Sequence, residues 1–338
     1  MVRLLLFLSA TIFSFYPRSG RAAPLDIILR NLAKPRFFGA AANTTFLFHD
    51  QNYTRLAETQ FSIFTPENEM KWESIEPFPD VFNFTAPDEI VRFAEARGAQ
   101  VRGHNFMWGN QLAPWVNDSL SATELDRALK NHINKIMEHY RGKLYAWDVI
   151  NELISDTPNT TFKDVIWTRK FGESAMPKAL TYAREADPQP KLYINEYGIE
   201  GVNFKSDALF EVVKSFKKDG DTLTSKVVFL FLINSAGVPL DGVGFQCHLR
   251  LGQVPPDLQQ NLQRFADLDL DVAITELDIN LGGPANETAL AQQAQDYEQV
   301  VSACVAVKRC VSVVRDSGVL RPRNLLTSSS VDNLGSVG

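Results

Sequence analysis

Hydrophobic and polar positions along the chain alternate between two kinds of pattern. Eight short runs are typical of strands, and they occupy residues 37–41, 61–65, 100–104, 144–150, 191–195, 242–246, 272–276 and 310–314. Between them, apolar residues recur every three or four positions, as on one face of a helix. Strands that alternate with helices predict parallel β-α units, and eight such strands close a (β/α)8 TIM barrel.

The clearest helix prediction lies between the third and fourth strand runs. Its apolar stripe, with steps of 4, 4, 3 and 4, consists of Leu125, Leu129, Ile133, Ile136 and Tyr140. Ser121 and Glu124 form a capping-box pattern just before this stripe. The competing fold is a doubly wound open sheet, but the glycine-rich phosphate turn that such sheets often carry is absent from the sequence. No linker rich in Pro, Gly or Ser divides the chain, so residues 24–338 are predicted to form a single domain.

The first 23 residues have the pattern of a secretory signal peptide. Arg3 precedes an apolar run over residues 4–16, and small residues at 19–23 offer a cleavage site near Ala22 or Ala23. This run of 13 residues is shorter than the ~20 that a membrane-spanning helix needs. We therefore expect residues 1–23 to be a signal peptide, the protein to be secreted, and no membrane to be a partner.

Secretion gives meaning to two further patterns. Six Asn-x-Ser/Thr sequons are candidate glycosylation sites, at Asn43, Asn52, Asn83, Asn117, Asn159 and Asn286. An oxidising compartment also makes Cys304 and Cys310 a candidate disulfide. Cys247, the third cysteine, is then expected to be a small buried side chain rather than a nucleophile.

Composition excludes several classes of function. The chain has 34 Lys and Arg against 40 Asp and Glu, a net charge of −6, and no long basic run, which argues against a nucleic-acid partner. Three cysteines are too few for a four-cysteine zinc site, and no His-Glu-x-x-His motif is present. We expect a monomeric globular protein without a metal or cofactor.

Polar residues gather at the C-terminal ends of the strand runs, which is the face that carries the active site in a parallel barrel. The fourth run is followed by Asn151 and Glu152, and the seventh ends in Glu276 with Asp278 two residues on. Carboxylates that follow apolar strands are costly unless they are paired or solvated. Their recurrence at several strand ends therefore predicts a functional site on this rim.

Two opposed carboxylates with amide and aromatic neighbours suit glycoside hydrolysis, in which a retaining enzyme needs a general acid and a nucleophile ~5–5.5 Å apart. Glu152 and Glu276 end different strands and would meet at one barrel rim. Asn151 is an amide that could hold a sugar 2-hydroxyl, and His248 and Asp278 could orient Glu276. Flat aromatic faces for sugar stacking are offered by Trp108 and Tyr197.

Three segments carry a family resemblance: TPENEMKW at 65–72, WDVINE at 147–152 and ITELD at 274–278. Together they resemble glycoside hydrolase family ten, most of whose members are endo-1,4-β-xylanases, over about residues 37–310. The resemblance implies a (β/α)8 barrel that hydrolyses internal bonds of xylan, or a related β-1,4-glycan, by double displacement. It implies Glu152 as the acid/base and Glu276 as the nucleophile.

The same resemblance implies a set of substrate-binding residues. Those on the glycone side are Glu67, Asn68, Lys71, His104, Trp108, Gln111 and Asn151. Gln246 and His248 also match family positions, and Tyr197 matches one on the aglycone side, while Asp278 would support Glu276. The spacing of Cys304 and Cys310 resembles that of the family's disulfide near the last strand.

The chain departs from the family pattern in two places. Residues 221–237, with the apolar run VVFLFLI, are an insert that is either a new loop near the aglycone end or translated intron sequence. After about residue 312 the family's tryptophan-containing segment and final helix are missing, and all five tryptophans lie before residue 168. The barrel is thus either complete or incomplete at strand and helix eight. We expect reduced stability and activity, and the alternative function is an impaired barrel that only binds β-1,4-glycans.

Overall fold

The computed structural model describes residue 31 and residues 33–217 and 237–316. Within these ranges, eight parallel strands form a closed ring in the order β1-β2-β3-β4-β5-β6-β8-β9, in which β6 pairs with β8 and β9 pairs with β1. Their bounds are β1 Phe37–Ala42, β2 Ile63–Pro66, β3 Gln100–Met107, β4 Ala146–Asn151, β5 Lys191–Glu196, β6 Gly242–Phe245, β8 Asp271–Asn280 and β9 Cys310–Arg315. The short β7, His248–Arg250, lies outside this ring and pairs with the far end of β8. The predicted TIM barrel is confirmed.

The prediction that strand eight could be incomplete is wrong. The eighth barrel strand, β9, pairs with β1 from Phe37↔Ser312 to Ala40↔Arg315 and so closes the ring. The ring closes because each edge strand gains a ladder of hydrogen bonds that it would otherwise lack. The expected departure in helix eight lies beyond residue 316, outside the described residues, as do the predicted signal peptide and all of the 221–237 insert except Gly237.

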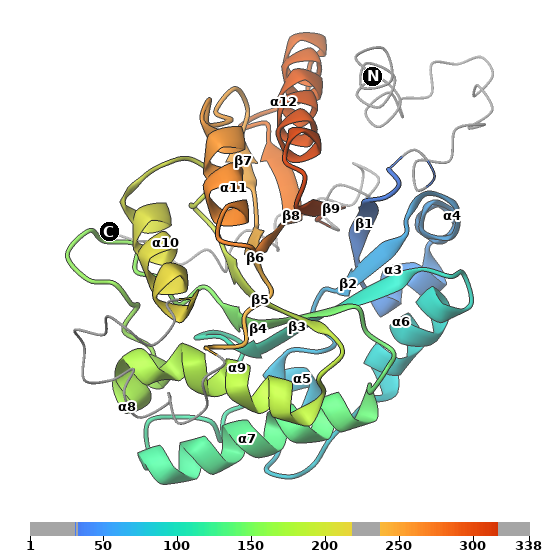
Figure 1. Cartoon of the computed structure of the whole chain (residues 1–338). Helices are drawn as coiled ribbons and strands as arrows, with labels where there is room; N and C mark the ends of the chain where they lie inside the picture. Colours follow the sequence, from blue (N-terminus) through green and yellow to red (C-terminus); the bar gives the residue numbers. More distant parts are fainter. Residues whose placement is uncertain (1–30, 32, 218–236, 317–338) are drawn as a thin grey trace.

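Helices surround the barrel (Figure 1). Their bounds are α3 Thr44–His49, α4 Gln51–Gln60, α5 Trp72–Ile75, α6 Thr85–Glu95, α7 Ala122–His139, α8 Ile166–Phe171, α9 Ala175–Ala186, α10 Phe204–Lys217, α11 Leu258–Ala266 and α12 Glu287–Ala306. Helices α7 and α9 pack side by side on one flank, and α11 and α12 on another (Figure 1). Within the described ranges, none of the helices has the length and apolar character that a membrane crossing requires.

Helix α7 illustrates how local sequence and packing agree. The capping box is present, because Ser121 accepts from the Glu124 backbone and Glu124 accepts from the Ser121 backbone. The predicted stripe faces the strands, and Leu125, Leu129 and Ile133 are fully buried. Each such side chain contributes about 1.5–3 kcal/mol relative to an exposed one. The helix thus packs against α9 and against β3, the strand that carries His104 and leads into Trp108.

The interior of the barrel is partly charged. Arg102 on β3 and Asp148 on β4 are each 1% exposed, and the guanidinium forms hydrogen bonds of 3.0 and 3.1 Å to the carboxylate. The Tyr193 ring lies 4.2 Å from the guanidinium carbon. Pairing and hydrogen bonding are what make such buried charges tolerable. Gly244 leaves room for this layer, since a Cβ there would lie 2.9 Å from Arg102 and collide with Asn195.

The cysteines behave as predicted. A disulfide joins Cys304 near the end of α12 to Cys310 at the start of β9, with a Cα–Cα distance of 5.3 Å. Cys247 is a free cysteine and is completely buried. Burial raises the pKa of the Cys247 thiol, and the nearby Glu200 and Asp278 add to this effect. The thiol therefore stays protonated and is a core side chain rather than a nucleophile.

Candidate active site

The predicted site residues lie at or just beyond the C-terminal ends of the strands, as expected for a parallel barrel. They follow β2 (Glu67, Asn68, Lys71), lie within β3 (His104) or follow it (Trp108, Gln111), end or follow β4 (Asn151, Glu152), follow β5 (Tyr197) and β6 (Gln246), and lie on β7 (His248) and β8 (Glu276, Asp278). Residues that are up to 211 positions apart, from Glu67 to Asp278, are thus brought to one rim by the closure of the ring.

Glu152 is held at both carboxylate oxygens. The indole Nε1 of Trp108 donates to Oε2 at 2.8 Å, and the amide Nε2 of Gln246 donates to Oε1 at 2.9 Å. Its backbone has a φ of 57°, a left-handed conformation that is uncommon for a non-glycine residue. The backbone N–H donates to Asn195 O at 3.0 Å, which holds the turn in place. Such a conformation, fixed by its surroundings, is a frequent mark of functional positions.

Glu276 is surrounded by groups that favour its charged form. Asn195 Nδ2 donates to Oε1 at 2.7 Å, and His248 Nε2 lies 3.2 Å from Oε2. Burial alone raises the pKa of this carboxyl. The hydrogen bonds from His248 and Asn195, together with the positive fields of His104 and His248, outweigh burial and lower the pKa to about 2. Glu276 is therefore an anion at any ordinary pH.

Three amides connect the two carboxylates. Asn151 Oδ1 accepts from Gln246 Nε2 at 3.3 Å and from Asn195 Nδ2 at 3.0 Å. Because Gln246 also donates to Glu152 and Asn195 also donates to Glu276, a continuous amide network spans the pair. The sequence did not single out Asn195. The signal that could have found it is its place at the polar end of the fifth strand run, next to Glu196 and Tyr197.

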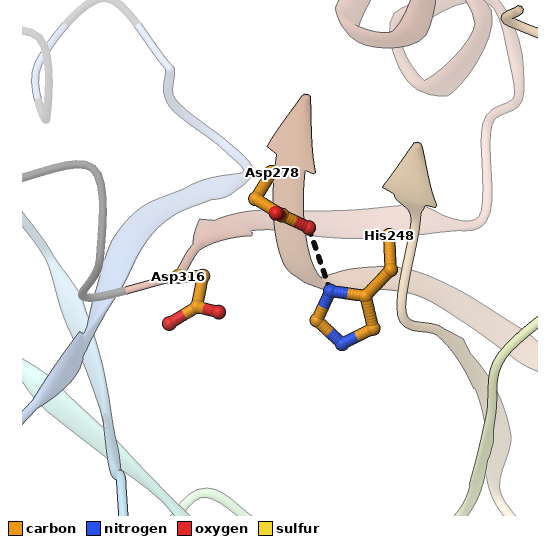
Figure 2. A group of neighbouring side chains, drawn as sticks. All are labelled: His248, Asp278 and Asp316. Carbon is orange, nitrogen blue, oxygen red and sulfur yellow. Dashed lines mark hydrogen bonds and ion pairs between the residues drawn. The ribbon is translucent and has the colours of Figure 1, made fainter. Parts of the chain in front are cut away.

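His248 and Asp278 lie opposite each other in the β7–β8 pairing, and Asp316 from the end of β9 lies beside them (Figure 2). His248 Nδ1 is 2.6 Å from Asp278 Oδ1. Partial burial lowers the pKa of the imidazole. The hydrogen bonds to Asp278 and Glu276 and their negative charges reverse this and raise it to about 11. His248 is thus an imidazolium that donates to Glu276 with one nitrogen and to Asp278 with the other.

In the described part of the chain, this cluster is the group whose ligand atoms lie close enough to hold a metal ion, within 4.8 Å of one another. A protonated imidazole has no lone pair to offer, so a metal would first have to displace one of its two protons, each of which is hydrogen-bonded to a carboxylate. Burial raises the pKa of Asp316, and the charges of Asp278 and Glu276 add to this effect. Both imidazole nitrogens of His248 are engaged by carboxylates in this cluster.

Residues predicted to lie on the glycone side form a second polar group. Lys71 Nζ donates to Asn68 Oδ1 at 2.9 Å and to Gln111 Oε1 at 2.7 Å, and it lies 5.0 Å from the Trp108 ring centroid. Burial lowers the pKa of Lys71, while the charges of Glu276, Glu67 and Glu152 oppose the change. The ammonium is therefore within the electrostatic reach of both predicted catalytic carboxylates.

Two further predicted residues lie deeper in this group. His104 is 6% exposed and contacts Asp148 through Nδ1 at 3.0 Å, which links the rim to the buried ion pair of the barrel interior. Glu67 Oε2 is buried without a hydrogen-bond partner among the described residues. A buried carboxylate oxygen of this kind is an acceptor for a ligand hydroxyl.

A closed parallel barrel, whose C-terminal rim carries two carboxylates joined by hydrogen bonds through amide side chains, defines a glycoside hydrolase of the TIM-barrel type. Residues 28–315 match the model of glycosyl hydrolase family 10, and the chain belongs to this family. The family resemblance deduced from the three sequence motifs is confirmed.

Similar proteins support the same family. Endo-1,4-β-xylanase C of Phanerodontia chrysosporium is 41% identical over 292 residues, which are 84% of this chain and 68% of that protein. The crystal structure of a glycosylated endo-β-1,4-xylanase from Gloeophyllum trabeum has a TM-score of 0.74 at 41% identity, and the match covers 85% of this chain and 86% of that one. Xylanase 10B from Thermotoga petrophila RKU-1, in complex with xylobiose, has a TM-score of 0.77 at 31% identity and covers 88% and 86%.

Proposed function

We propose that this chain is a secreted, retaining endo-1,4-β-xylanase that hydrolyses internal β-1,4-xylosidic bonds of xylan. The observation that carries the proposal is the amide network of Gln246, Asn151 and Asn195, which holds Glu152 and Glu276 at the same rim. Membership in glycosyl hydrolase family 10 and the endo-xylanase relatives support xylan as the substrate. The binding-only alternative is not favoured, because both carboxylates and their partners are present.

In the proposed mechanism, Glu276 is the nucleophile and Glu152 the acid/base. Glu276 is anionic and attacks the anomeric carbon, while Glu152 protonates the departing glycosidic oxygen. Glu152 then takes a proton from a water molecule, whose oxygen displaces Glu276 and releases the sugar. The double displacement preserves the anomeric configuration. Trp108 and Gln246 keep the Glu152 carboxyl in one orientation through both steps.

The neighbouring residues are proposed to bind the sugar on each side of the scissile bond. Asn151 Oδ1 is engaged by two donors, so its amino group is the part left to donate to the sugar 2-hydroxyl. Hydrogen bonds at that hydroxyl strengthen in the transition state. On the glycone side, Glu67, Asn68, Lys71, His104, Trp108 and Gln111 would bind the sugar, and on the aglycone side Tyr197 would offer an aromatic face.

We also propose that the protein is secreted, glycosylated and monomeric. The N-terminal 1–23 pattern and the Cys304–Cys310 disulfide suit an oxidising extracellular compartment. The asparagines of five sequons are exposed: Asn52, Asn83, Asn117, Asn159 and Asn286. Asn43 is half-buried, and its side chain caps α3 by accepting from Thr45 N at 3.0 Å. The site is built from one chain, so a monomer would suffice.

The proposed function predicts covalent labelling of one residue. The purified chain should release xylo-oligosaccharides from xylan, and a 2-deoxy-2-fluoro-xylobioside with a good leaving group should inactivate it by trapping the glycosyl-enzyme. Peptide mass spectrometry should find the added sugar on Glu276. Absence of both hydrolysis and labelling, or a label on another residue, would refute the assignment.

A second prediction concerns pH. The Glu276 pKa of about 2 means that its charge is retained down to very acid pH, so Glu276 does not limit kcat/KM above about pH 3. In His248→Gln the positive partner is lost while burial remains, so the Glu276 pKa rises. We expect the acid limb of kcat/KM on xylan to move up by about 1–2 pH units.

The matched control for this variant is His139→Gln. His139 on α7 also pairs with an aspartate, Asp88, at 2.8 Å, but on the outside of the barrel. Its pH profile should coincide with that of the wild type. An unchanged acid limb in His248→Gln would contradict the role given to His248.

A further inference from the structure

The Tyr197 side chain is surrounded by charged groups. Its hydroxyl donates to Asp156 Oδ2 at 2.7 Å and accepts from Lys163 Nζ at 3.0 Å. The Lys205 ammonium lies 3.4 Å from the ring centroid and so covers one face of the ring. Burial and the hydrogen bond to Asp156 raise the pKa of the phenol, so the hydroxyl remains a donor. The contacts of the hydroxyl and the ammonium over one face thus fix the position and tilt of the Tyr197 ring.

Lys205, near the start of α10, joins two carboxylates behind this ring. Its Nζ is 2.7 Å from Asp156 Oδ1 and 3.0 Å from Glu196 Oε1. The side chains of Lys205 and Glu196 are 4% and 0% exposed, whereas that of Asp156 is 51% exposed. Burial raises the pKa of Glu196 to about 7 against the attraction of Lys205. A buried pair with this desolvation cost is weak as a source of stability, and a role in specifying geometry explains it better.

The same charges connect the aglycone side to the segment that carries Glu152. Asp156 and Lys163 lie 4 and 11 positions after Glu152, in the connection between β4 and α8. This connection folds back on itself, since Ile154 bridges to Phe162. Glu196 Oε2 accepts from the Ile154 backbone N–H at 3.0 Å. The chain that follows Glu152 is therefore joined to the chain around Tyr197 by three hydrogen-bonding residues. Asp156 and Lys163 contact the Tyr197 hydroxyl, and Glu196 contacts the Ile154 backbone.

We propose that Asp156 and Lys205 are positioning residues that hold Tyr197 in register with Glu152, so that the leaving-group sugar is aligned for protonation. The inference rests on the proposed function, because it requires Glu152 to be the acid and Tyr197 to contact the aglycone. Neither Asp156 nor Lys205 touches the reacting atoms. Their effect acts through Tyr197 and is confined to substrates whose leaving group is a sugar.

The test compares two substrates in Asp156→Asn. Xylotetraose has sugars on the aglycone side. The leaving group of β-xylobiosyl fluoride is instead a single fluoride ion, which contacts no aglycone residue. We expect kcat/KM for xylotetraose to fall about tenfold, the equivalent of one charge-assisted hydrogen bond, and kcat/KM for the fluoride to stay within about twofold of wild type. Transfer of the xylobiosyl group from the enzyme to an added xylobiose acceptor, relative to water, should fall by a similar factor.

The matched control is Asp126→Asn. Asp126 on α7 also accepts from a tyrosine hydroxyl, that of Tyr182 at 2.9 Å, and pairs with a lysine, Lys178, at 2.8 Å, but these contacts join the outer helices α7 and α9. Its kcat/KM should be unchanged for both substrates. Lys205→Met combined with Glu196→Gln removes the buried pair without leaving a lone charge, and it should reproduce the selective loss.

Three outcomes would overturn the inference. Equal losses on both substrates would indicate a general structural role, and no loss on either would mean that Asp156 does not position Tyr197. A wild-type chain that turns over neither substrate would refute the proposed function, and the inference with it. Wild-type activity on the fluoride therefore distinguishes failure of the inference from failure of the function.

Discussion

Replacing Glu276 with alanine is expected to lower kcat on xylan by about 10⁴–10⁶-fold, because no covalent intermediate can then form. The fold should survive, since the side chain is 25% exposed and its loss leaves His248 paired with Asp278. Added azide should enter the space of the missing carboxylate and attack the anomeric carbon. With an activated xylobioside the product should be the α-xylobiosyl azide, of inverted configuration.

Proton NMR of the azide product and steady-state kinetics check this result. Glu185→Ala serves as the control, because Glu185 is an exposed carboxylate that pairs with Lys130 on the outer helices. Its kcat should equal that of the wild type. Residual activity of Glu276→Ala above about 1% of wild type, or a β-configured azide, would be incompatible with Glu276 as the nucleophile.

Replacing Glu152 with alanine is expected to lower kcat/KM on xylan by about 10²–10⁴-fold, the usual contribution of general acid catalysis. The loss should depend on the leaving group. A dinitrophenolate departs without protonation, so the first step on 2,4-dinitrophenyl β-xylobioside should remain fast. The second step should become slow, because no base remains to activate water.

A stopped-flow burst of dinitrophenolate followed by slow turnover is the measurement. Azide should accelerate turnover here as well, but through attack on the glycosyl-enzyme, so the product should be the β-xylobiosyl azide of retained configuration. The opposite azide anomers in the two variants separate the roles of Glu152 and Glu276. An equal loss on xylan and on the dinitrophenyl substrate would exclude Glu152 as the acid/base.

The strands of the barrel could be predicted from short apolar runs, but their ends could not. The seventh run was predicted at 272–276, and β8 extends over Asp271–Asn280. The additional length is stabilised by β7, whose His248 pairs with Asp278. The partner of that extension is 30 positions away in the sequence, and such non-local pairing has no local pattern to reveal it.

The candidate site was predictable to a similar degree. Glu152, Glu276 and most of the predicted neighbours, which the structure places at one rim, could be singled out because they follow strands and belong to recognisable motifs. Asn195 and Asp316 were missed, since neither lies in those motifs and each acts through neighbours from other strands. Lys205 is the clearest case: on a helix its sequence context predicts an exposed lysine, yet its side chain is 4% exposed between Glu196 and Asp156.

The sequence by itself determined which segments become strands and helices and which carboxylates stand at strand ends, because hydrophobic period and local motifs are properties of neighbouring residues. Only the tertiary structure decided which of those polar groups meet. Closure of the ring between β9 and β1 brings eight strand ends to one rim. There, burial and neighbouring charges set the protonation states of the titratable side chains. Glu276 is held as an anion and His248 as its cation by that proximity, because Coulomb interactions and desolvation depend on distance in space rather than along the chain.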